Sequence, residues 1–260
     1  MPELPDVEIF RQYAEKHALN KKIKDVEYFD SRVLQTSKQM ITTSLKGKEL
    51  SGTQRRGKYL FLRAGDRYMV MHFGMTGYLV YFKAGDDKPD YAQLILDFDN
   101  DHSLAYISKR KLGKIDIIDD IEAYSKDNDL GIDVYDSGFD DFMKAMKNKR
   151  GNIKSALMDQ SHVSGIGNIY ADEVLYQEKL HPGAKIQDLD ENKMKSLFNT
   201  IQRVFRTAIN HKANPDDLPD HYLLPHRSEG ESCPDCRGKI RKITVSGRST
   251  YFCPGCQVKG

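Results

Sequence analysis

The sequence predicts an α+β protein with about two domains, and three observations carry this prediction. An apolar stripe at helical spacing opens the chain, and short apolar runs separated by turn residues fill residues 22–120. After about residue 121 the pattern becomes helical, and all four cysteines fall in a short tail. The chain has 260 residues, which is more than a single hydrophobic core usually stabilises, so about two domains are expected.

The first predicted element is a helix over roughly residues 5–19. Val7, Phe10, Tyr13 and Ala14 share one face at helical spacing. Pro5 suits the first turn, where its missing N–H matters least. This helix would therefore bury one apolar stripe against the region that follows.

Residues 22–120 are predicted to be β-rich. Glycine- and aspartate-containing turns separate short apolar runs at a spacing typical of an antiparallel sandwich or barrel. The runs are 59–62, 68–71, 77–82, 94–98, 104–107 and 115–118.

The segment after residue 121 is predicted to be helical. Its clearest helix spans residues 189–211, where apolar side chains recur at the i, i+3, i+4 and i+7 positions of one face. Phe142, Met143 and Met146 indicate a second helical face. Residues 212–232 form a polar, proline-containing loop, and the tail from Cys233 consists of short strands.

The cysteine tail has the spacing of a metal site. Cys233 and Cys236 form one CxxC pair, and Cys253 and Cys256 form another. Four thiolates on two chain turns can close a tetrahedral Zn²⁺ site, and two β-prone runs between them indicate a hairpin. Since four cysteines leave no open coordination position, one structural Zn²⁺ is expected. The alternatives are two disulfides or a redox CxxC.

Composition excludes several classes of protein. The 40 basic and 38 acidic residues give a net charge of +2, so the chain is not a uniformly cationic nucleic-acid binder. No apolar run approaches the ~20 residues of a membrane span, and residues 1–10 do not resemble a signal peptide. A reducing, cytosolic location is therefore the default expectation. Basic residues nevertheless gather at 109–114, 144–154 and 237–260, which indicates either one cationic face or several solvated faces.

A glycine-rich turn precedes a predicted helix at residues 163–173. Its Gly165-Ile166-Gly167-Asn168 segment offers backbone N–H groups that could bind an anion, as in a helix–turns–helix clamp on a nucleic-acid backbone. The alternative is a simple interhelical loop. Arg248, at the tip of the predicted hairpin, could contact a phosphate or could be a solvated turn residue.

The N-terminus carries a candidate nucleophile. Removal of Met1 would leave Pro2 as a free secondary amine, which attacks carbonyl-like carbons more readily at neutral pH than an ordinary lysine does. Glu3 beside it could move protons. The alternative is that Met-Pro is merely an ordinary start of a protein.

Together these features resemble the Fpg/Nei family of DNA glycosylase/AP lyases (formamidopyrimidine-DNA glycosylase and endonuclease VIII). The resemblance covers nearly the whole chain. It is carried by PELPDVE at 2–8, Gly57-Lys58-Tyr59-Leu60, HFGMTG at 72–77, the stretch from Ile153 to Gln160, GIGNIYADEVL at 165–175 and GRSTYFCPGCQ at 247–257. It implies a catalytic β-sandwich domain over 1–125, a helical DNA-binding domain with a helix–two-turns–helix over 126–215, and a loop with a four-cysteine zinc-finger hairpin over 216–260.

The resemblance also implies a mechanism in base excision repair. The amine of Pro2 attacks C1′ of a damaged nucleoside flipped out of double-stranded DNA, and Glu3 acts as the acid/base group. By similarity, Lys58 assists β-elimination and Arg248 assists δ-elimination. A cleft between domains would bring the basic segments onto one DNA, and the protein is expected to act as a monomer. The resemblance assigns DNA contacts to Met75, Arg110, Leu112, Arg150, Lys154 and Asn168, of which Met75 and Arg110 fill the space left by the flipped nucleotide.

Three departures from the family pattern bear on the substrate. Leu112 stands where Fpg enzymes usually carry phenylalanine, and Tyr91 falls about where a DNA-contacting histidine is common. The 212–232 loop is shorter than the loop that covers 8-oxoguanine, and its Tyr-Gly-Arg element reads Pro225-His226-Arg227. The expected substrates are formamidopyrimidines and 8-oxoguanine. The alternatives are an oxidised-pyrimidine enzyme with weak 8-oxoguanine activity, or a non-catalytic damage-binding protein.

Overall fold

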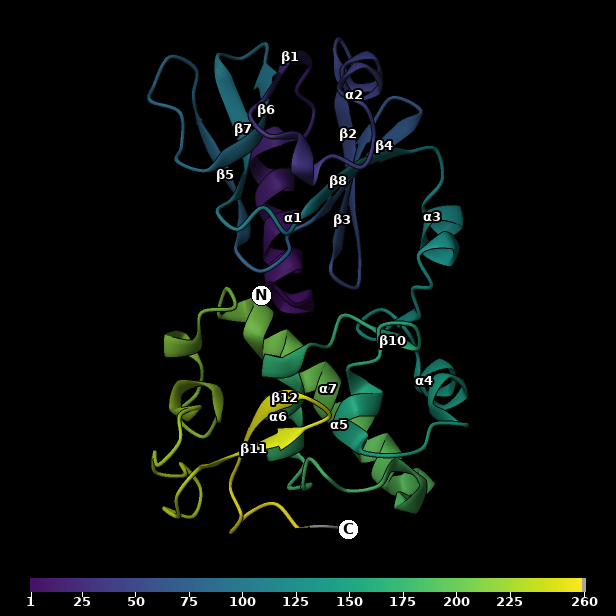
Figure 1. Ribbon diagram of the computed structural model, residues 1–260, viewed down its shortest axis with the longest axis vertical. Helices are drawn as coiled ribbons and strands as arrows, with labels where there is room; N and C mark the ends of the chain where they lie inside the picture. The colour runs from purple at the N-terminus through teal and green to yellow at the C-terminus, as the bar shows by residue number, and fades with distance from the viewer. Residues whose placement is uncertain (259–260) are drawn as a thin grey trace. The chain divides into compact units, whose positions relative to one another are not determined.

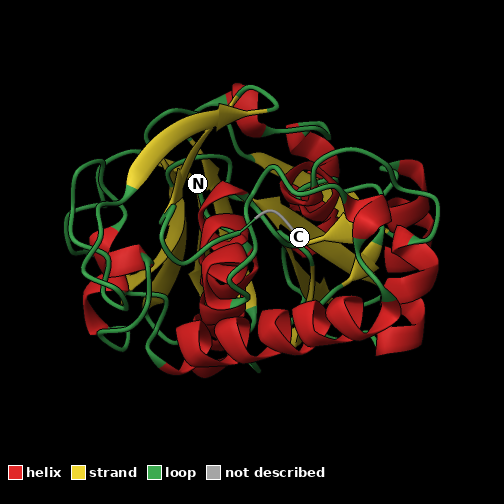
Figure 2. Cartoon of the chain, turned by 90° about the horizontal axis from the view of Figure 1, so that it is seen from below, coloured by secondary structure: helices red, strands yellow, loops and turns green. Residues whose placement is uncertain are grey.

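The computed structural model describes residues 1–258 and confirms the predicted α+β class. The chain divides into two compact units, the first formed by residues 1–2 and 6–128 and the second by residues 3–5 and 129–260. Strands dominate the first unit and helices the second (Figure 1), and Figure 2 draws the helices in red and the strands in yellow. The expected three-domain division near residues 125 and 215 stays a prediction. Among the described residues, no helix combines the length and apolar character that crossing a bilayer demands.

Unit 1 is the predicted sandwich of two four-stranded antiparallel sheets. The strand orders are β1-β6-β7-β5 and β2-β3-β4-β8. Apolar side chains of both sheets, such as Leu60, Met71, Leu96 and Tyr106, form one buried core. The bounds are β1 Ile23–Tyr28, β2 Leu50–Arg56, β3 Tyr59–Ala64, β4 Arg67–His72, β5 Gly77–Lys83, β6 Ala92–Phe98, β7 His102–Ser108 and β8 Lys114–Ile118.

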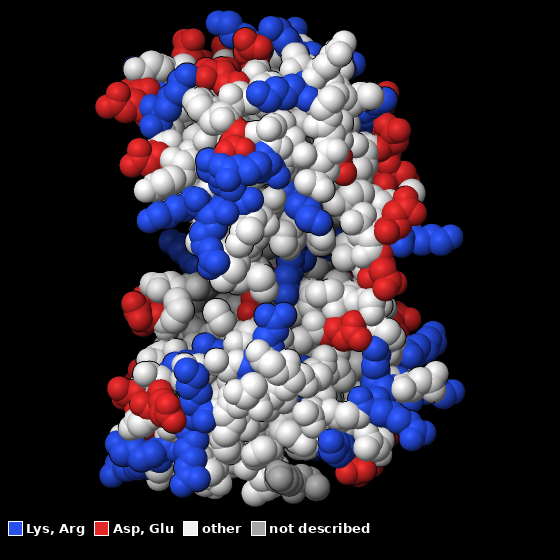
Figure 3. Space-filling model, viewed as in Figure 1, with Lys and Arg blue, Asp and Glu red and all other residues white. Residues whose placement is uncertain are grey.

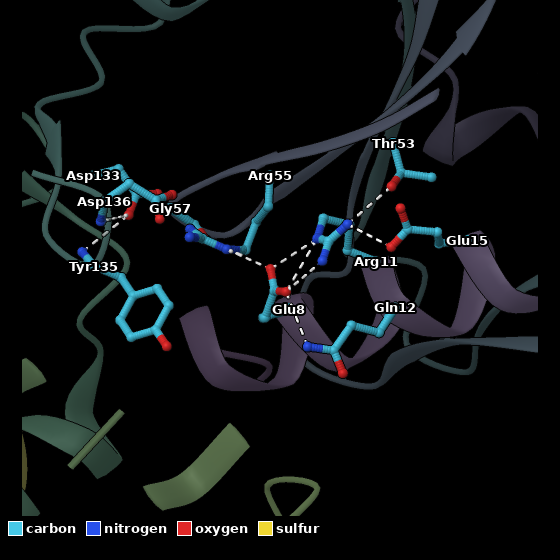
Figure 4. Close-up of polar contacts among 10 residues, drawn as sticks. All are labelled: Glu8, Arg11, Gln12, Glu15, Thr53, Arg55, Gly57, Asp133, Tyr135 and Asp136. Atoms are coloured by element: carbon cyan, nitrogen blue, oxygen red, sulfur yellow. Dashed lines mark hydrogen bonds and ion pairs between the residues drawn. The ribbon is translucent and has the colours of Figure 1, made fainter. Parts of the chain in front are cut away.

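Helix α1 (Leu4–Ala18) matches the predicted first helix and contributes to both cores. Val7 and Ala14 are buried in the core of unit 1, whereas Leu4 belongs to the core of unit 2. Figure 4 shows Glu8 of α1 accepting hydrogen bonds from Arg11 and, at 3.2 Å, from Nε of Arg55 on β2. Burial would raise the pKa of Glu8, but its bonds to Arg11 and Gln12 outweigh burial and lower that pKa. The ionised Glu8 therefore ties the start of α1 to the sandwich.

One helix interrupts the region expected to be β-rich. Helix α2 (Lys38–Leu45) begins after Ser37, whose side chain accepts a hydrogen bond from the backbone N–H of Met40. Ile41 and Leu45, four residues apart, are buried on one face. The sequence analysis did not predict this helix, because only two buried apolar residues mark its face in a short, polar segment. A 3₁₀ turn (η1, Ser31–Val33) precedes α2, and helix α3 (Ile121–Asp127) follows β8.

Unit 2 is built mainly from helices around one apolar core. Helix α7 agrees with the predicted 189–211 helix, and Leu197, Ile201 and Phe205 bury its apolar face. Two residues of β9 (Ile132–Asp133) pair in parallel with β10 (Val163–Ser164), and Asp133 Oδ1 accepts the backbone N–H groups of Tyr135 and Asp136 (Figure 4). The helices are α4 Phe139–Met146, α5 Ile153–Leu157, α6 Asn168–Gln177 and α7 Glu191–Asn210, with a 3₁₀ turn η2 at Ile186–Asp188.

The predicted hairpin is present as β11 (Arg241–Val245) paired with β12 (Arg248–Phe252). The loop before it contains the 3₁₀ turns η3 (Pro215–Asp217) and η4 (Leu224–His226). This loop is less polar in its packing than expected, because Leu218, Tyr222, Leu223 and Leu224 are all buried. The last two residues of the basic 237–260 segment, Lys259 and Gly260, lie outside the described residues.

Candidate functional site

The carboxylate of Glu3 caps helix α6. Its two oxygens accept hydrogen bonds from the backbone N–H groups of Gly167 (2.8 Å), Ile169 (2.8 Å) and Tyr170 (3.1 Å). Glu3 is 1% exposed, and the helix has no capping side chain of its own. The glycine-rich turn does bind an anion, but the anion in the structure is this side chain rather than a nucleic-acid phosphate.

Two glycines make this docking possible. A Cβ on Gly167 would lie 2.3 Å from Cδ of Glu3, and one on Gly165 would lie 2.4 Å from Cδ1 of Leu4. Gly165 also has φ +110°, a backbone conformation that side-chain-bearing residues rarely adopt. The backbone N–H of Leu4 donates to the carbonyl of Gly165 at 3.1 Å. The residues that follow Pro2 are thus fixed by contacts that only glycine allows.

Lys58 follows Gly57 in the turn between β2 and β3 and is 7% exposed. The positive charge of Lys58 affects the pKa of His72, which lies at the end of β4. Burial above all, and then the positive charges of Lys58 and Lys114, lower the pKa of His72 to about 4. A neutral His72 can accept the backbone N–H of Gly74 at 3.3 Å. The imidazole therefore helps to hold the loop that carries Met75.

Unit 1 brings Met75, Arg110 and Leu112 together on two adjoining loops. The backbone N–H of Arg110 donates to Oγ1 of Thr76 at 3.2 Å, and a Cβ on Gly74 would lie 2.5 Å from the carbonyl carbon of Leu112. Met75 is 42% exposed and Leu112 52% exposed. Two large apolar side chains are thus exposed on loops that contact each other. Tyr91 is also exposed, with Nζ of Lys109 lying 5.3 Å from its ring centroid.

Unit 2 places Lys154, Asn168 and the hairpin strand β12 side by side. Nδ2 of Asn168 donates to the carbonyl of Ser249 at 3.0 Å, and Nζ of Lys154 donates to Oγ1 of Thr250 at 2.7 Å. Arg248 is exposed at the start of β12. Lys154, by contrast, is 1% exposed, so its ammonium group faces the protein. Arg150 is exposed beside a different cavity, which Met146 and Met194 also line.

The basic side chains lie on the surfaces of both units. Figure 3 shows Lys and Arg side chains interspersed with acidic ones on the face that it draws. Exposed Lys109 and Arg110 in unit 1, and Arg150 and Arg248 in unit 2, belong to the basic segments identified in the sequence.

The four cysteines form a cluster that fits a metal ion. Their Sγ atoms all lie within 4.8 Å of one another, with 3.7 Å between Cys233 and Cys256 and 3.4 Å between Cys236 and Cys253. Both distances are far above the ~2.05 Å of a disulfide bond. Zn–S bonds of ~2.3 Å at tetrahedral angles would place sulfurs roughly 3.8 Å apart. The geometry therefore favours a four-thiolate metal site over two disulfides.

Sequence reasoning missed three residues that organise this site. Asp172 and Glu173 are fully buried in α6, and Arg227 bonds to Asp172. The signal was present, because two consecutive acids stand inside an otherwise apolar helical run. A buried carboxylate requires partners, so such a pair predicts a polar network.

The chain resembles known proteins over nearly its whole length. Family models match residues 1–115 (formamidopyrimidine-DNA glycosylase N-terminal domain), 130–216 (its H2TH domain) and 230–258 (zinc finger found in FPG and IleRS). The chain is 32% identical to a formamidopyrimidine-DNA glycosylase of Desulforamulus reducens, over 99% of both proteins. It is 34% identical to that of Lactococcus lactis subsp. cremoris over the full length of both.

Solved structures of formamidopyrimidine-DNA glycosylases also resemble this chain over nearly its whole length. A complex of Lactococcus lactis Fpg with DNA containing an abasic site has a TM-score of 0.90 at 30% identity, covering 99% of this chain and 100% of that one. The complex of the same enzyme with DNA containing Fapy-dG has a TM-score of 0.89 at 31% identity with the same coverage. These matches confirm the resemblance found in the sequence.

Proposed function

The chain belongs to the formamidopyrimidine-DNA glycosylase family, and we propose that it is a bifunctional DNA glycosylase/AP lyase that acts on oxidised or ring-opened bases in double-stranded DNA. The capping of α6 by Glu3 is the observation that carries the proposal. It fixes the residue that is covalently joined to Pro2, so the N-terminal amine is attached to a rigid anchor. Precise positioning of a nucleophile is worth several orders of magnitude in rate.

The reaction starts when Pro2, freed of Met1, attacks C1′ of the flipped nucleoside. The bond between C1′ and the base breaks, and the base leaves with a proton. Ring opening at O4′ then gives an iminium between Pro2 and C1′, with Glu3 as the proton donor and acceptor. Three backbone N–H groups hold the Glu3 carboxylate in place for this work.

Two eliminations follow from the iminium. Loss of a C2′ proton breaks the C3′–O3′ bond, and loss of a C4′ proton breaks the C5′–O5′ bond. Each departing phosphate oxygen keeps the electron pair of the broken bond. Lys58 assists the first step and Arg248 the second, and water finally releases the sugar remnant from Pro2.

Met75, Arg110, Leu112, Arg150 and Asn168 contact the DNA in this proposal, whereas Lys154, buried in the structure, acts on the hairpin from within. The exposure of Met75 and Arg110 supports their role in filling the space of the flipped nucleotide, and exposed Leu112 can act as a wedge beside them. Asn168 and Lys154 support the hairpin that presents Arg248. One Zn²⁺ held by Cys233, Cys236, Cys253 and Cys256 would supply folding energy to a tail that has only a small apolar core.

Substrate range has a second candidate. Leu112 is exposed where an aromatic ring would stack on the opposite base, and aliphatic side chains stack poorly. This observation favours a broader range that includes oxidised pyrimidines, with weak action on 8-oxoguanine.

Borohydride trapping tests the proposal. Untagged protein would be incubated with duplexes carrying 8-oxoguanine opposite C, dihydrouracil opposite G, or an abasic site. A covalent protein–DNA band is expected on at least the abasic duplex, and none from Pro2→Gly or from protein with a residual tag before Pro2. Trapping on dihydrouracil but not on 8-oxoguanine would identify the broader range. A blank gel with N-terminally processed protein would leave the binding-only alternative.

A further inference from the structure

A buried carboxylate in α6 connects the hairpin to the loop before it. Oδ1 of Asp172 lies 2.7 Å from Nζ of Lys154, and Oδ2 accepts hydrogen bonds from Nη2 (2.7 Å) and Nε (2.9 Å) of Arg227. Oδ2 also accepts the backbone N–H of Tyr251 at 3.1 Å. The side chain of Asp172 is 0% exposed, that of Lys154 1% and that of Arg227 17%. The buried carboxylate of Asp172 thus contacts two cationic side chains and the backbone of a hairpin strand.

This network fixes the strand that presents Arg248. Thr250 accepts Nζ of Lys154 at 2.7 Å and donates to the carbonyl of Arg248 at 3.1 Å. The next residue, Tyr251, is held through its backbone by Asp172. Arg248, Thr250 and Tyr251 of β12 are therefore tied, directly or through Lys154, to the carboxylate of Asp172.

The same carboxylate holds the loop. Arg227 directly follows the 3₁₀ turn η4 and binds Asp172 through both Nε and Nη2. Its guanidinium carbon also lies 4.6 Å from the ring centroid of Tyr251, so the loop residue packs on the hairpin as well. Movement of the loop end would therefore be transmitted to β12 through Asp172 and Tyr251.

The energetic balance makes the network sensitive to any one partner. Burial lowers the pKa of Lys154, and the charge of Asp172 opposes that effect. Removing the charge of Asp172 leaves two cations without their shared counter-ion in a buried place, which is costly. The hairpin strand would then lose the contacts that set its position.

We infer that Asp172 is a positioning residue. It holds Arg248 in the position needed for the second elimination, and it couples the position of Arg248 to that of the loop that contains Arg227. This inference rests on the proposed function, because it assumes that Arg248 neutralises the phosphate that leaves when the C5′–O5′ bond breaks. Asp172 itself does not touch DNA in this scheme.

The test measures the ratio of elimination products under single-turnover conditions with saturating enzyme. An abasic duplex is used, so that lesion recognition does not enter the result. Asp172→Asn is expected to raise the ratio of β-product to β,δ-product about tenfold, since a small misplacement of a catalytic group costs a large factor. Borohydride trapping should stay within about twofold of the unmodified protein. The exposed residue Asp188 supplies the matched control, Asp188→Asn, which should leave the ratio unchanged.

Arg227 supplies a second, less buried variant. Arg227→Gln is expected to shift the ratio in the same direction, and Arg227→Lys to restore part of it, because lysine keeps the charge but not the two-pronged geometry. Zinc content and thermal melting check that each variant is folded. If Asp172→Asn does not fold, the Arg227 pair decides the matter.

The outcomes separate the inference from the proposed function. Loss of trapping in the unmodified protein would overturn the proposed function. Normal trapping with an unchanged product ratio in the folded variants would overturn only the positioning role. A uniform loss of both eliminations and of trapping would also overturn it, since that pattern indicates general damage to the fold.

Discussion

The carboxylate of Glu3 accepts the backbone N–H of Gly167 at 2.8 Å, across 164 residues of sequence. The pair joins the N-terminus to the helical unit and leaves no room for a larger residue at position 167. A glycine at the start of a helix is commonly explained by backbone freedom. Here it is required by the close approach of the glutamate.

We therefore expect Gly167→Ala to destabilise the protein by about 2 kcal/mol, because its Cβ would lie 2.3 Å from Cδ of Glu3. Borohydride trapping should fall as well, since Glu3 must move. Gly138→Ala is the matched control: Gly138 also precedes a helix, and a Cβ there meets nothing within 4 Å. Equal unfolding free energies for the two variants in urea would contradict this account.

Glu173 predicts a pH dependence of stability. Burial raises the pKa of Glu173 from 4.5 to about 7, although hydrogen bonds from Gln177 and from the backbone of Leu223 and Leu224 oppose the shift. Between those pH values the folded protein keeps a proton that the unfolded chain has lost, so the free energy of unfolding falls as pH rises. The shift corresponds to about 3 kcal/mol over that window.

Urea unfolding at several pH values, compared between the unmodified protein and Glu173→Gln, isolates this contribution. The difference in unfolding free energy between the two should change across the window and level off above about pH 7. Glu229→Gln, at an exposed position, should parallel the unmodified protein at every pH. A constant difference between the unmodified protein and Glu173→Gln would show that Glu173 does not titrate as described.

Metal removal should unfold the tail. Beneath the hairpin, the small core contains Leu223 and Ile240 together with Cys233 and Cys253, so the thiolates are part of the packing. With the metal chelated, we expect hydrogen exchange of residues 233–257 to approach that of an unfolded chain. Affinity for an abasic duplex should fall in parallel. Protection that persists after complete zinc loss, verified by elemental analysis, would refute the prediction.

Leu112 offers a gain-of-function prediction. Because Leu112 is exposed, Leu112→Phe should present an aromatic ring that can stack on a base. Stacking of this kind contributes about 1–3 kcal/mol, so binding of an abasic duplex should tighten about tenfold. Met40→Phe serves as the control, because Met40 is also an exposed apolar residue and lies on α2, away from these loops in the sequence. An equal increase in affinity for the abasic duplex in both variants would indicate nonspecific binding through the added aromatic ring.

Salt dependence provides a further check on the basic segments. Binding that neutralises several phosphates releases counter-ions, so affinity should fall steeply as salt rises. Arg150→Gln should weaken binding and reduce the slope of log affinity against log salt by about one unit. Lys212→Gln, in the loop after α7, is the comparison. An unchanged slope in Arg150→Gln would remove Arg150 from the DNA interface.

Much of the fold could be read from the sequence because its signals are local. Helices α1 and α7 follow from apolar periodicity, and the strands of the sandwich follow from short runs between turns. The cysteine spacing indicated the cluster that the structure contains. Helix α2 was not predicted, because Ile41 and Leu45 are the two apolar residues that mark its buried face in a short, polar segment.

The organisation of the candidate site was harder to foresee because it depends on distant pairs. The anion bound by the glycine-rich turn is Glu3, and no local pattern connects residues so far apart. The sequence places Lys154 in a charged run that is typical of an exposed surface. In the structure its side chain is buried and forms an ion pair with buried Asp172. Such pairings are decided by tertiary packing, which periodicity and composition do not encode.

The order in which a ribosome makes this chain gives the Glu3 anchor another consequence. Glu3 and Leu4 are synthesised first, but the α6 backbone and the core that receive them come more than 160 residues later. At roughly 5–20 residues per second, the newly made N-terminus waits on the order of ten seconds for its binding place. During that interval the end of the chain is free of the contacts that later hold Glu3 and Leu4. Removal of Met1, which the proposed mechanism requires, would act on this unanchored end or, after folding, on an anchored end where Met1 is 48% exposed.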